Sequence, residues 1–232
     1  MSADAVQRLE VVAHIRTDFP SKFGIPRQSG LIDALKGTIV FTEAYRDASA
    51  LRGIEGFSHL WLIWQFSESV MDRWSPTVKP PRLGGNTRVG VFATRSPFRP
   101  NPLGLSCVRL EGVEYGTPEG PVLRVAGADL LDGTPIYDIK PYIPYADCRP
   151  DATGGFTDSI AYERLEVAFP ESLLALIPPE KREALIQVLA QDPRPGYRHG
   201  DDGRRYGVEF AGFDVRFVVA EGTLRVVEVV KL

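Results

Sequence analysis

Residues 89–105 read VGVFATRSPFRPNPLGL, and this stretch decides the fold that the sequence predicts. In its first five residues, apolar side chains alternate with smaller or more exposed ones, as they do in a β-strand. Three prolines then end the strand, because each fixes φ and removes a backbone donor. A second apolar strand is expected at 105–110. Arg95 and Arg99 are therefore expected in a stiff loop between two strands, which either stays solvated or grips a ligand.

The composition is that of an ordinary globular chain. Of 232 residues, 44% are hydrophobic and 25% are charged, and the formal net charge of −3 still permits a local basic face for nucleic acid. The two cysteines are far apart in sequence and lack metal-binding spacing, so we expect a reducing, cytoplasmic compartment and no metal. The sequence shows neither an apolar run of membrane-spanning length nor a signal-peptide pattern.

Short strands separated by glycine and proline turns dominate the N-terminal part of the chain. We therefore predict a mainly β protein whose N-terminal domain is an antiparallel β-barrel. The expected strands are residues 9–16, 37–41, 56–66, 107–113, 122–125 and 136–144, of which 56–66 is expected to be the central buried strand. A short helical turn is expected at 46–52, with Asp47 as its N-cap. His59 is expected to serve the structure rather than catalysis.

The pattern changes after a small, polar segment at 146–162, where we place a linker. Two helices are expected beyond it, at 170–177 and 180–191, and Pro179 suits the first turn of the second helix. A β-hairpin is expected over residues 213–230. The tail is therefore predicted to be a small α+β domain that carries a basic, aromatic loop.

Three loops carry side chains that suit a ligand. Residues 26–30 contain Gln28, which offers a donor and acceptors, and a glycine that lets a ligand approach the backbone closely. In residues 127–133, Asp129 and Asp132 are suited to accept hydrogen bonds from a ribose or an amine, and both equally suit ordinary turns. The third loop is the proline-rich loop with its two arginines.

Residues 67–88 form a long irregular segment in which cationic residues surround Trp74. Such a segment either follows a phosphate backbone or is a plain solvated loop. The sequence lacks a dinucleotide-binding glycine motif, a P-loop, a zinc-type Cys/His cluster and a serine nucleophile elbow. The residue patterns alone therefore predict a barrel with candidate binding loops and do not identify a reaction.

Six segments taken together resemble the TrmO family, also called TsaA-like. In chain order they are KFGIPRQSGL (22–31), GFSHLW (56–61), PPRLGGN (80–86), GVFATRSPFRPNPLG (90–104), DLLDGTPIYDIKPYIP (129–144) and LAQDPRPGYR (189–198). The resemblance implies an S-adenosylmethionine-dependent tRNA methyltransferase. It implies a β-barrel cofactor domain at 1–150 and a small α+β domain, facing tRNA, at 165–232. One residue departs from the family pattern, Leu103, where isoleucine is frequent.

The resemblance also implies the substrate and the cofactor-binding residues. The methyl acceptor would be N6 of N6-threonylcarbamoyladenosine next to the anticodon of threonine tRNAs, and the enzyme would be a homodimer. The implied cofactor-binding residues are Gln28, Ser29, Gly30, Phe66, Ser67, Arg95, Leu105, Ala128, Asp129, Leu130 and Asp132. The candidates for tRNA contact, mainly through phosphates, are Arg73, Lys79, Arg82, Arg88, Arg99, Arg194 and Arg198.

The implied acceptor nitrogen resembles that of a urea, so it must lose its proton before or during attack. Asp138, Lys140 and Tyr142 are the candidate catalytic residues. Arg99, Lys140 and Arg194 are the candidates for binding the threonyl carboxylate of the substrate. Two alternatives stay open at this point: a non-catalytic sensor that binds S-adenosylmethionine, and an RNA-binding module.

Overall fold

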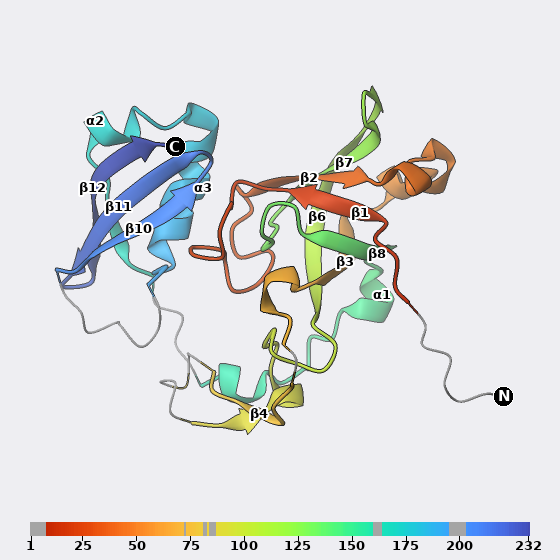
Figure 1. The fold of residues 1–232 in the computed structure, drawn as a ribbon, viewed down its shortest axis with the longest axis horizontal. Coiled ribbons are helices and arrows are strands. Elements are labelled where there is room, and N and C mark those ends of the chain that lie inside the picture. The colour runs from red at the N-terminus through yellow and green to blue at the C-terminus, as the bar shows by residue number, and fades with distance from the viewer. Residues whose placement is uncertain (1–7, 72, 81–82, 84–86, 160–163, 195–202) are drawn as a thin grey trace.

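The N-terminal part of the chain is a closed β-barrel, seen near the centre of Figure 1, which shows the computed structural model. The structure describes residues 8–71, 73–80, 83, 87–159, 164–194 and 203–232. The barrel strands, in the order in which they pair, are β1 (Ala13–Arg16), β2 (Lys36–Phe41), β7 (Gly120–Ala126), β6 (Leu103–Thr117), β3 (His59–Gln65) and β8 (Pro135–Pro141). All of these pairs are antiparallel, which confirms the predicted fold class.

Strand β3 lies between β6 and β8, at the place expected for the central strand. Its burial differs from the prediction of a strand buried on both faces. Leu60, Leu62 and Trp64 are buried inside the barrel, whereas the residues between them are only partly buried. The reason is that a barrel strand has one face toward the core and one face outside it.

The strand expected at 89–93 is mostly wrong. Only Val89–Gly90 is a strand, β5, and it pairs with β4 (Thr77–Val78) in a small hairpin outside the barrel. Val91–Ala93 instead forms a 3₁₀ turn, because Val91 is buried and its N–H donates to the carbonyl of Pro76 at 2.9 Å. The second strand of the opening stretch is confirmed, and β6 is longer than predicted.

The C-terminal part is a four-stranded sheet with two helices. Its elements are β9 (Glu166–Ala168), α2 (Glu171–Leu174), α3 (Pro179–Ala190), β10 (Arg205–Phe210), β11 (Phe213–Ala220) and β12 (Thr223–Lys231), with the sheet order β10-β11-β12-β9. The predicted hairpin and the proline at the start of α3 are confirmed. The sequence did not predict β9, a short strand parallel to β12, or β10.

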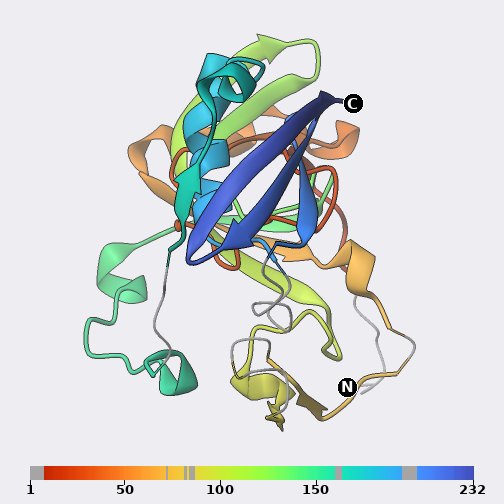
Figure 2. The ribbon, with the colours of Figure 1, turned by 90° about the vertical axis from the view of Figure 1, so that its left-hand side faces the viewer.

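The described residues form separate hydrophobic clusters, one inside the barrel and one under the C-terminal sheet. The second cluster includes Phe19 and Leu35, which belong to the loop between β1 and β2. The ring of Phe19 packs edge-on against Phe210 at 5.3 Å, and Lys181 Nζ lies 2.6 Å from the Asp18 carboxylate. This loop, red in Figures 1 and 2, therefore joins the barrel to the C-terminal unit.

Short helical turns connect the strands. They are η1 (Glu43–Tyr45), η2 (Ala48–Leu51), η3 (Ile54–Gly56), η4 (Ser67–Ser69), η6 (Val91–Ala93), α1 (Pro144–Asp147) and η7 (Gly155–Thr157). The predicted N-cap is confirmed, since the Asp47 carboxylate accepts the backbone N–H of Ser49 at 2.8 Å. In the described parts of the chain, no helix combines the length and apolar character needed to cross a bilayer.

Candidate functional site

A groove of about 1800 Å³ opens beside one end of the barrel. Its walls come from the β1–β2 loop, the end of β3, the β4–β5 hairpin, the proline-rich loop and the turn at Gly155–Thr157. Several predicted cofactor residues line it, namely Gln28, Phe66, Ser67, Arg95, Leu105 and Asp129. Its volume exceeds that of a typical small-molecule pocket, so it has room for a cofactor and part of a larger substrate.

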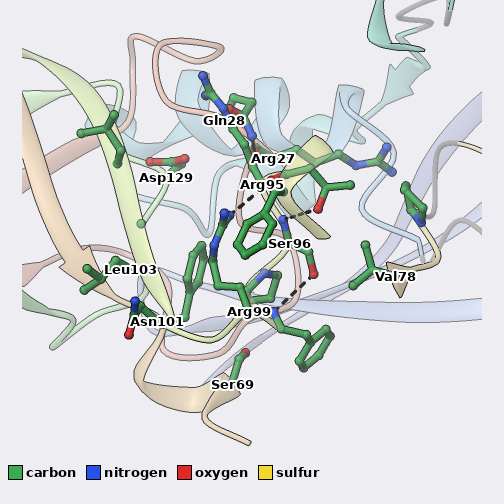
Figure 3. A pocket seen from close by; sticks show the side chains of 18 of the residues that line it. Arg27, Gln28, Ser69, Val78, Arg95, Ser96, Arg99, Asn101, Leu103 and Asp129 are labelled. Carbon is green, nitrogen blue, oxygen red and sulfur yellow. Dashed lines mark hydrogen bonds between the residues drawn. The ribbon is translucent and has the colours of Figure 1, made fainter. Parts of the chain in front are cut away.

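Two of the predicted loops meet in this groove. The Arg95 guanidinium donates a hydrogen bond to Oε1 of Gln28, although the two residues are 67 positions apart. Figure 3 shows these two side chains beside each other, with Arg99 farther along the same groove. The prediction that residues 26–30 and 95–104 serve one site therefore has a geometric basis.

The proline-rich loop is held rigid by its own side chains. The Thr94 hydroxyl donates to the carbonyl of Val91 at 2.9 Å and accepts the backbone N–H of Ser96 at 3.2 Å. The Arg99 guanidinium donates to the carbonyl of Thr94 at 3.2 Å. These local bonds, together with the prolines, fix where the two arginines leave the backbone.

Asp129 lies at the end of a hydrogen-bond chain that begins inside the barrel. Trp64 Nε1 donates to the Ser106 hydroxyl at 2.9 Å, and that hydroxyl donates to Asp129 Oδ1 at 2.6 Å. Burial raises the pKa of Asp129 to about 6, although the bond from Ser106 and the charge of Arg95 both act to lower it. A groove carboxylate with this pKa is typical of functional sites rather than of surface acids. The sequence patterns did not identify Trp64 or Ser106, which read as ordinary inward-facing strand residues.

Hydrogen bonds hold the loop at 26–30 against the loop at 127–133 and against β6. The N–H of Gly30 donates to the carbonyl of Gly127 at 2.9 Å, and the Ser29 hydroxyl accepts the N–H of Cys107 at 3.0 Å. A Cβ at Gly127 would lie 3.3 Å from the Gly30 backbone, and both glycines have positive φ. Glycine is therefore required here for close packing as well as for conformation.

Four predicted cofactor residues direct their side chains elsewhere. Ser29 is used in the backbone contact described above, and Ala128 and Leu130 are buried in the barrel core. The Asp132 carboxylate accepts the backbone N–H of Thr17 at 2.9 Å, as a turn residue does. None of these four, nor Gly30, is among the described residues that line the groove, so their assignment to the cofactor stays a prediction.

The predicted tRNA-binding residues divide into groups. Lys79, Arg88 and Arg99 line the groove, and Arg73 is exposed but is not among its described lining residues. Arg194 differs from the others, because its side chain is only 4% exposed and makes two bonds of 2.8 Å to the Asp192 carboxylate. Its contact with a substrate stays a prediction, and its described bonds are those of a buried ion pair. Arg82 and Arg198 lie outside the described residues.

The predicted catalytic candidates lie on the outside of the barrel. Lys140 Nζ is 2.7 Å from the Asp138 carboxylate, and the ring of Tyr142 contacts those of Trp61 and His59. Asp138, Lys140 and Tyr142 are all absent from the described lining of the groove. The catalytic role of these three residues therefore stays a prediction, which the described lining of the groove in one chain does not support. The alternation along β8 did not reveal which face they would take.

Several lining residues were not predicted from the sequence. They are Lys22, Arg27, Phe92, Phe98, Gly154, Phe156 and Thr157 among others. Phe92 and Phe98 belong to residues 89–105 and lie close in sequence to Arg95 and Arg99. This proximity is the feature of the sequence that could have indicated them. The residues at 154–157 were assigned to a linker, because nothing local indicates that they fold back onto the groove.

The groove is more positive than the rest of the molecule. Among its described lining residues are six cationic side chains (Lys22, Arg27, Lys79, Arg88, Arg95 and Arg99) and two carboxylates (Glu68 and Asp129). The chain as a whole has a formal net charge of −3. The positive charge is therefore concentrated at the site, which favours an anionic substrate.

Comparison with known proteins gives matches in both parts of the chain. Residues 14–148 match the model of the tRNA-methyltransferase O N-terminal domain, and residues 162–232 match that of the TrmO C-terminal domain. The chain is 42% identical over 226 residues to a tRNA (adenine(37)-N6)-methyltransferase of Escherichia coli, covering 94% of this chain and 96% of that protein.

Two relatives from Pseudomonas aeruginosa add to the comparison. One, described as a putative S-adenosylmethionine-dependent methyltransferase RcsF, is 46% identical over 213 residues, covering 89% of this chain and 90% of that protein. The other is the crystal structure of TrmO, which superposes with a TM-score of 0.78 at 36% identity over 100% of both chains.

Proposed function

The chain belongs to the tRNA-methyltransferase O family, and from that premise we propose how its groove performs a methyl transfer to tRNA. It is an S-adenosylmethionine-dependent tRNA (adenine-N6)-methyltransferase, as its named relatives are. The observation that carries the proposal is the joining of Gln28, Arg95 and Asp129 in one groove whose other charged lining residues are mainly cationic. Such a groove suits a cofactor and an anionic nucleic acid together.

The charges of the site fit the cofactor. S-adenosylmethionine carries a sulfonium and an ammonium, which are cationic, and a carboxylate, which is anionic. Asp129 supplies a carboxylate and Arg95 a guanidinium on the same wall of the groove. We assign these two side chains, with Gln28, to the cofactor, and Phe66 and Leu105 to its apolar surface. When bound, the cofactor supplies an electrophilic methyl group.

The acceptor that we propose is N6 of N6-threonylcarbamoyladenosine in threonine tRNAs. Its threonyl carboxylate needs a cation, and a guanidinium can bind it through two parallel hydrogen bonds. Of the three candidates for this role, Arg99 is the one whose side chain lines the groove, since Arg194 is buried and Lys140 is paired outside it. The chain's main contribution is then to hold the acceptor in line with the methyl group.

We further propose that the enzyme works as a homodimer in the cytoplasm, where its tRNA substrate is found. The outer face of β3 and β6 supports a second copy as partner. On that face Leu105 is 52% exposed and stands opposite Ile63, while Trp61 stands opposite Cys107. A partner on this face would also approach Asp138, Lys140 and Tyr142. In a dimer these residues could contact the substrate in the partner's groove, although they lie outside the groove of their own chain.

We also propose that the chain divides into a cofactor domain at 1–150 and a tRNA-facing domain at 165–232. The loop between β1 and β2 crosses this division, because Phe19 packs in the C-terminal cluster while Gln28 lines the groove. The C-terminal domain therefore supports the cofactor loop as well as carrying cationic residues.

One experiment separates the enzyme from the two alternatives. The protein is incubated with S-adenosylmethionine labelled in its methyl group and with tRNA that carries or lacks the threonylcarbamoyl group. Transfer to the modified tRNA alone is the expected result. Cofactor binding without transfer would instead indicate a sensor. Retention of tRNA with neither cofactor binding nor transfer would indicate an RNA-binding module.

The two arginines of the proline-rich loop are expected to have separable effects. Arg95→Ala should weaken S-adenosylmethionine binding about tenfold, because it removes a charged group from the cofactor wall. Arg99→Ala should reduce that affinity by less, through loss of its bond to the Thr94 carbonyl, and should mainly raise the KM for modified tRNA. Calorimetric titration of the cofactor and steady-state kinetics with tRNA measure the two effects. An equal loss of cofactor affinity in both variants would contradict the assignment, and Arg52→Ala, on an exposed turn away from the groove, is the control.

A further inference from the structure

In the described chain, the exposed aromatic side chains Phe92 and Phe98 line the groove, and Trp74 lies beside Phe92. Phe92 is 75% exposed, Trp74 is 51% exposed and Phe98 is 48% exposed. The rings of Phe92 and Trp74 lie 6.3 Å apart at an angle of 35°. A cluster of large exposed aromatics on a soluble domain usually marks an interaction site.

The exposure of Phe92 is built into the backbone. Its neighbour Val91 is buried, and the Val91 N–H donates to the carbonyl of Pro76 at 2.9 Å. The 3₁₀ turn of η6 then directs Phe92 outward. The β4–β5 hairpin ties this turn to the segment that carries Trp74, so the two rings are presented together.

Cationic side chains line the same groove as two of these rings. Lys79, Arg88 and Arg99 line the same groove as Phe92 and Phe98. Arg88 is fixed in place, since its guanidinium donates to the Thr77 hydroxyl at 2.8 Å and to the Thr77 carbonyl at 3.2 Å. Aromatic rings set among cations along one groove are the arrangement that binds single-stranded nucleic acid, the rings stacking on bases and the cations meeting phosphates.

From this geometry we propose that Phe92, with Trp74 and Phe98, forms a stacking platform for unpaired nucleobases that flank the methylated nucleotide in the tRNA. The inference rests on the proposed function, because it concerns how the same site holds its RNA. Bases of a single-stranded loop are read when they are splayed out and stacked on aromatic side chains. A platform beside the cofactor wall would hold the neighbouring bases while the acceptor nucleotide enters the groove.

Charge favours RNA over a second copy of the chain as the occupant. The described lining of the groove has six cationic side chains and two carboxylates. A symmetric dimer formed through this face would bring cation against cation, which is unfavourable. A polyanion with exposed base faces matches both the charge and the rings.

The test uses an anticodon stem-loop RNA with 2-aminopurine beside the modified adenosine, mixed with the full-length protein. We expect wild-type protein to quench the 2-aminopurine fluorescence on binding, and Phe92→Leu to bind about tenfold more weakly and without quenching. Phe92→Trp should restore both, because it restores an aromatic face. S-adenosylmethionine affinity should be unchanged in both variants. Tyr115→Ala, which removes an exposed aromatic on the β6–β7 hairpin, is the matched control and should behave as wild type.

The other outcomes overturn the platform or the function separately. Wild-type affinity and quenching in Phe92→Leu would show that an apolar surface suffices and that no stacking occurs. A change of oligomeric state in Phe92→Leu, measured by sedimentation, would show that a second copy covers the patch. Failure of the proposed function would appear differently, as an absence of methyl transfer by wild-type protein. The binding and quenching of the same RNA would then still test the platform.

Discussion

Asp129→Asn is expected to make the protein more stable at neutral pH and to weaken its binding of S-adenosylmethionine. Burial raises the pKa of Asp129 from 3.8 to about 6, so ionising it in the folded state costs free energy that asparagine does not cost. At about 1.4 kcal/mol for each pKa unit, the gain is about 3 kcal/mol at pH 7.5. Asparagine keeps the acceptor for the Ser106 hydroxyl, so the hydrogen-bond chain can remain.

The effect has a defined pH window. Because the folded pKa is raised, the wild-type protein keeps the full stability of a neutral Asp129 below about pH 4. It loses that stability as the pH rises through about 6. The variant does not titrate at this position. The difference between the two free energies of unfolding should therefore grow from near zero at pH 4 to its full value at neutral pH.

The affinity for the cofactor should decrease in Asp129→Asn, although the stability increases. Removing the carboxylate removes a charge-assisted contact to the cationic cofactor, which is worth about 2 kcal/mol, or about thirtyfold in Kd. For the wild type, affinity should also fall as the pH is lowered through about 6, because Asp129 becomes protonated. A gain in stability with a loss of binding is the pattern expected of a residue kept for function.

Urea unfolding at a series of pH values and calorimetric titration of the cofactor measure the two effects. Asp132→Asn is the matched control, since the Asp132 side chain accepts the Thr17 N–H and is not among the described groove-lining residues. It should leave cofactor affinity unchanged. If Asp129→Asn were less stable than wild type at pH 7.5, the carboxylate would be stabilised in its charged form and the assignment would fail.

Gly104→Ala is expected to destabilise the protein by about 3 kcal/mol and to disturb the cofactor wall. Gly104 is buried in β6 opposite Trp64, and a Cβ at this position would overlap the indole ring, with Cδ2 only 2.7 Å away. The indole cannot move freely, because its Nε1 donates to Ser106 and its ring packs against Phe66 at 4.3 Å. The cost combines overpacking of the core with loss of a buried hydrogen bond.

The same strand provides the control for this prediction. Gly112 lies in β6 with open space around its Cα and a φ outside the left-handed region, so Gly112→Ala should change stability little. Urea unfolding compares the two variants, and the fluorescence of Trp64 should change in Gly104→Ala alone. Equal free energies of unfolding in both variants would show that the barrel relaxes around the added methyl group.

Much of the fold could be predicted from the sequence, because strand alternation and turn residues act over short distances. The strands around 37–41 and 122–125 lie where the alternation placed them. The stiffness of the proline-rich loop also follows from its own residues. By contrast, most of the strand expected at 89–93 is a turn. The N–H of Val91 donates to the carbonyl of Pro76, and the residues adjacent to Val91 do not predict this contact.

For the candidate site too, part could be predicted from the sequence and part depended on contacts between residues far apart in the chain. The resemblance placed Gln28, Arg95 and Asp129 in a cofactor site, and the structure brings all three to one groove. It did not distinguish side chains that face the groove from those that face the core, as at Leu130. The sequence also did not indicate that Arg194, a candidate for substrate contact, is buried against Asp192.

By itself the sequence determined the β class, the helices and hairpin of the tail, the stiff arginine loop and the family. The tertiary structure alone decided which charges share the groove. It also decided that the β1–β2 loop packs on the C-terminal sheet, and that Trp64 and Ser106 support Asp129. The physical reason is the distance along the chain over which each effect acts. Backbone preferences depend on adjacent residues, whereas burial, pKa and contact depend on barrel closure, which brings together side chains far apart in the chain.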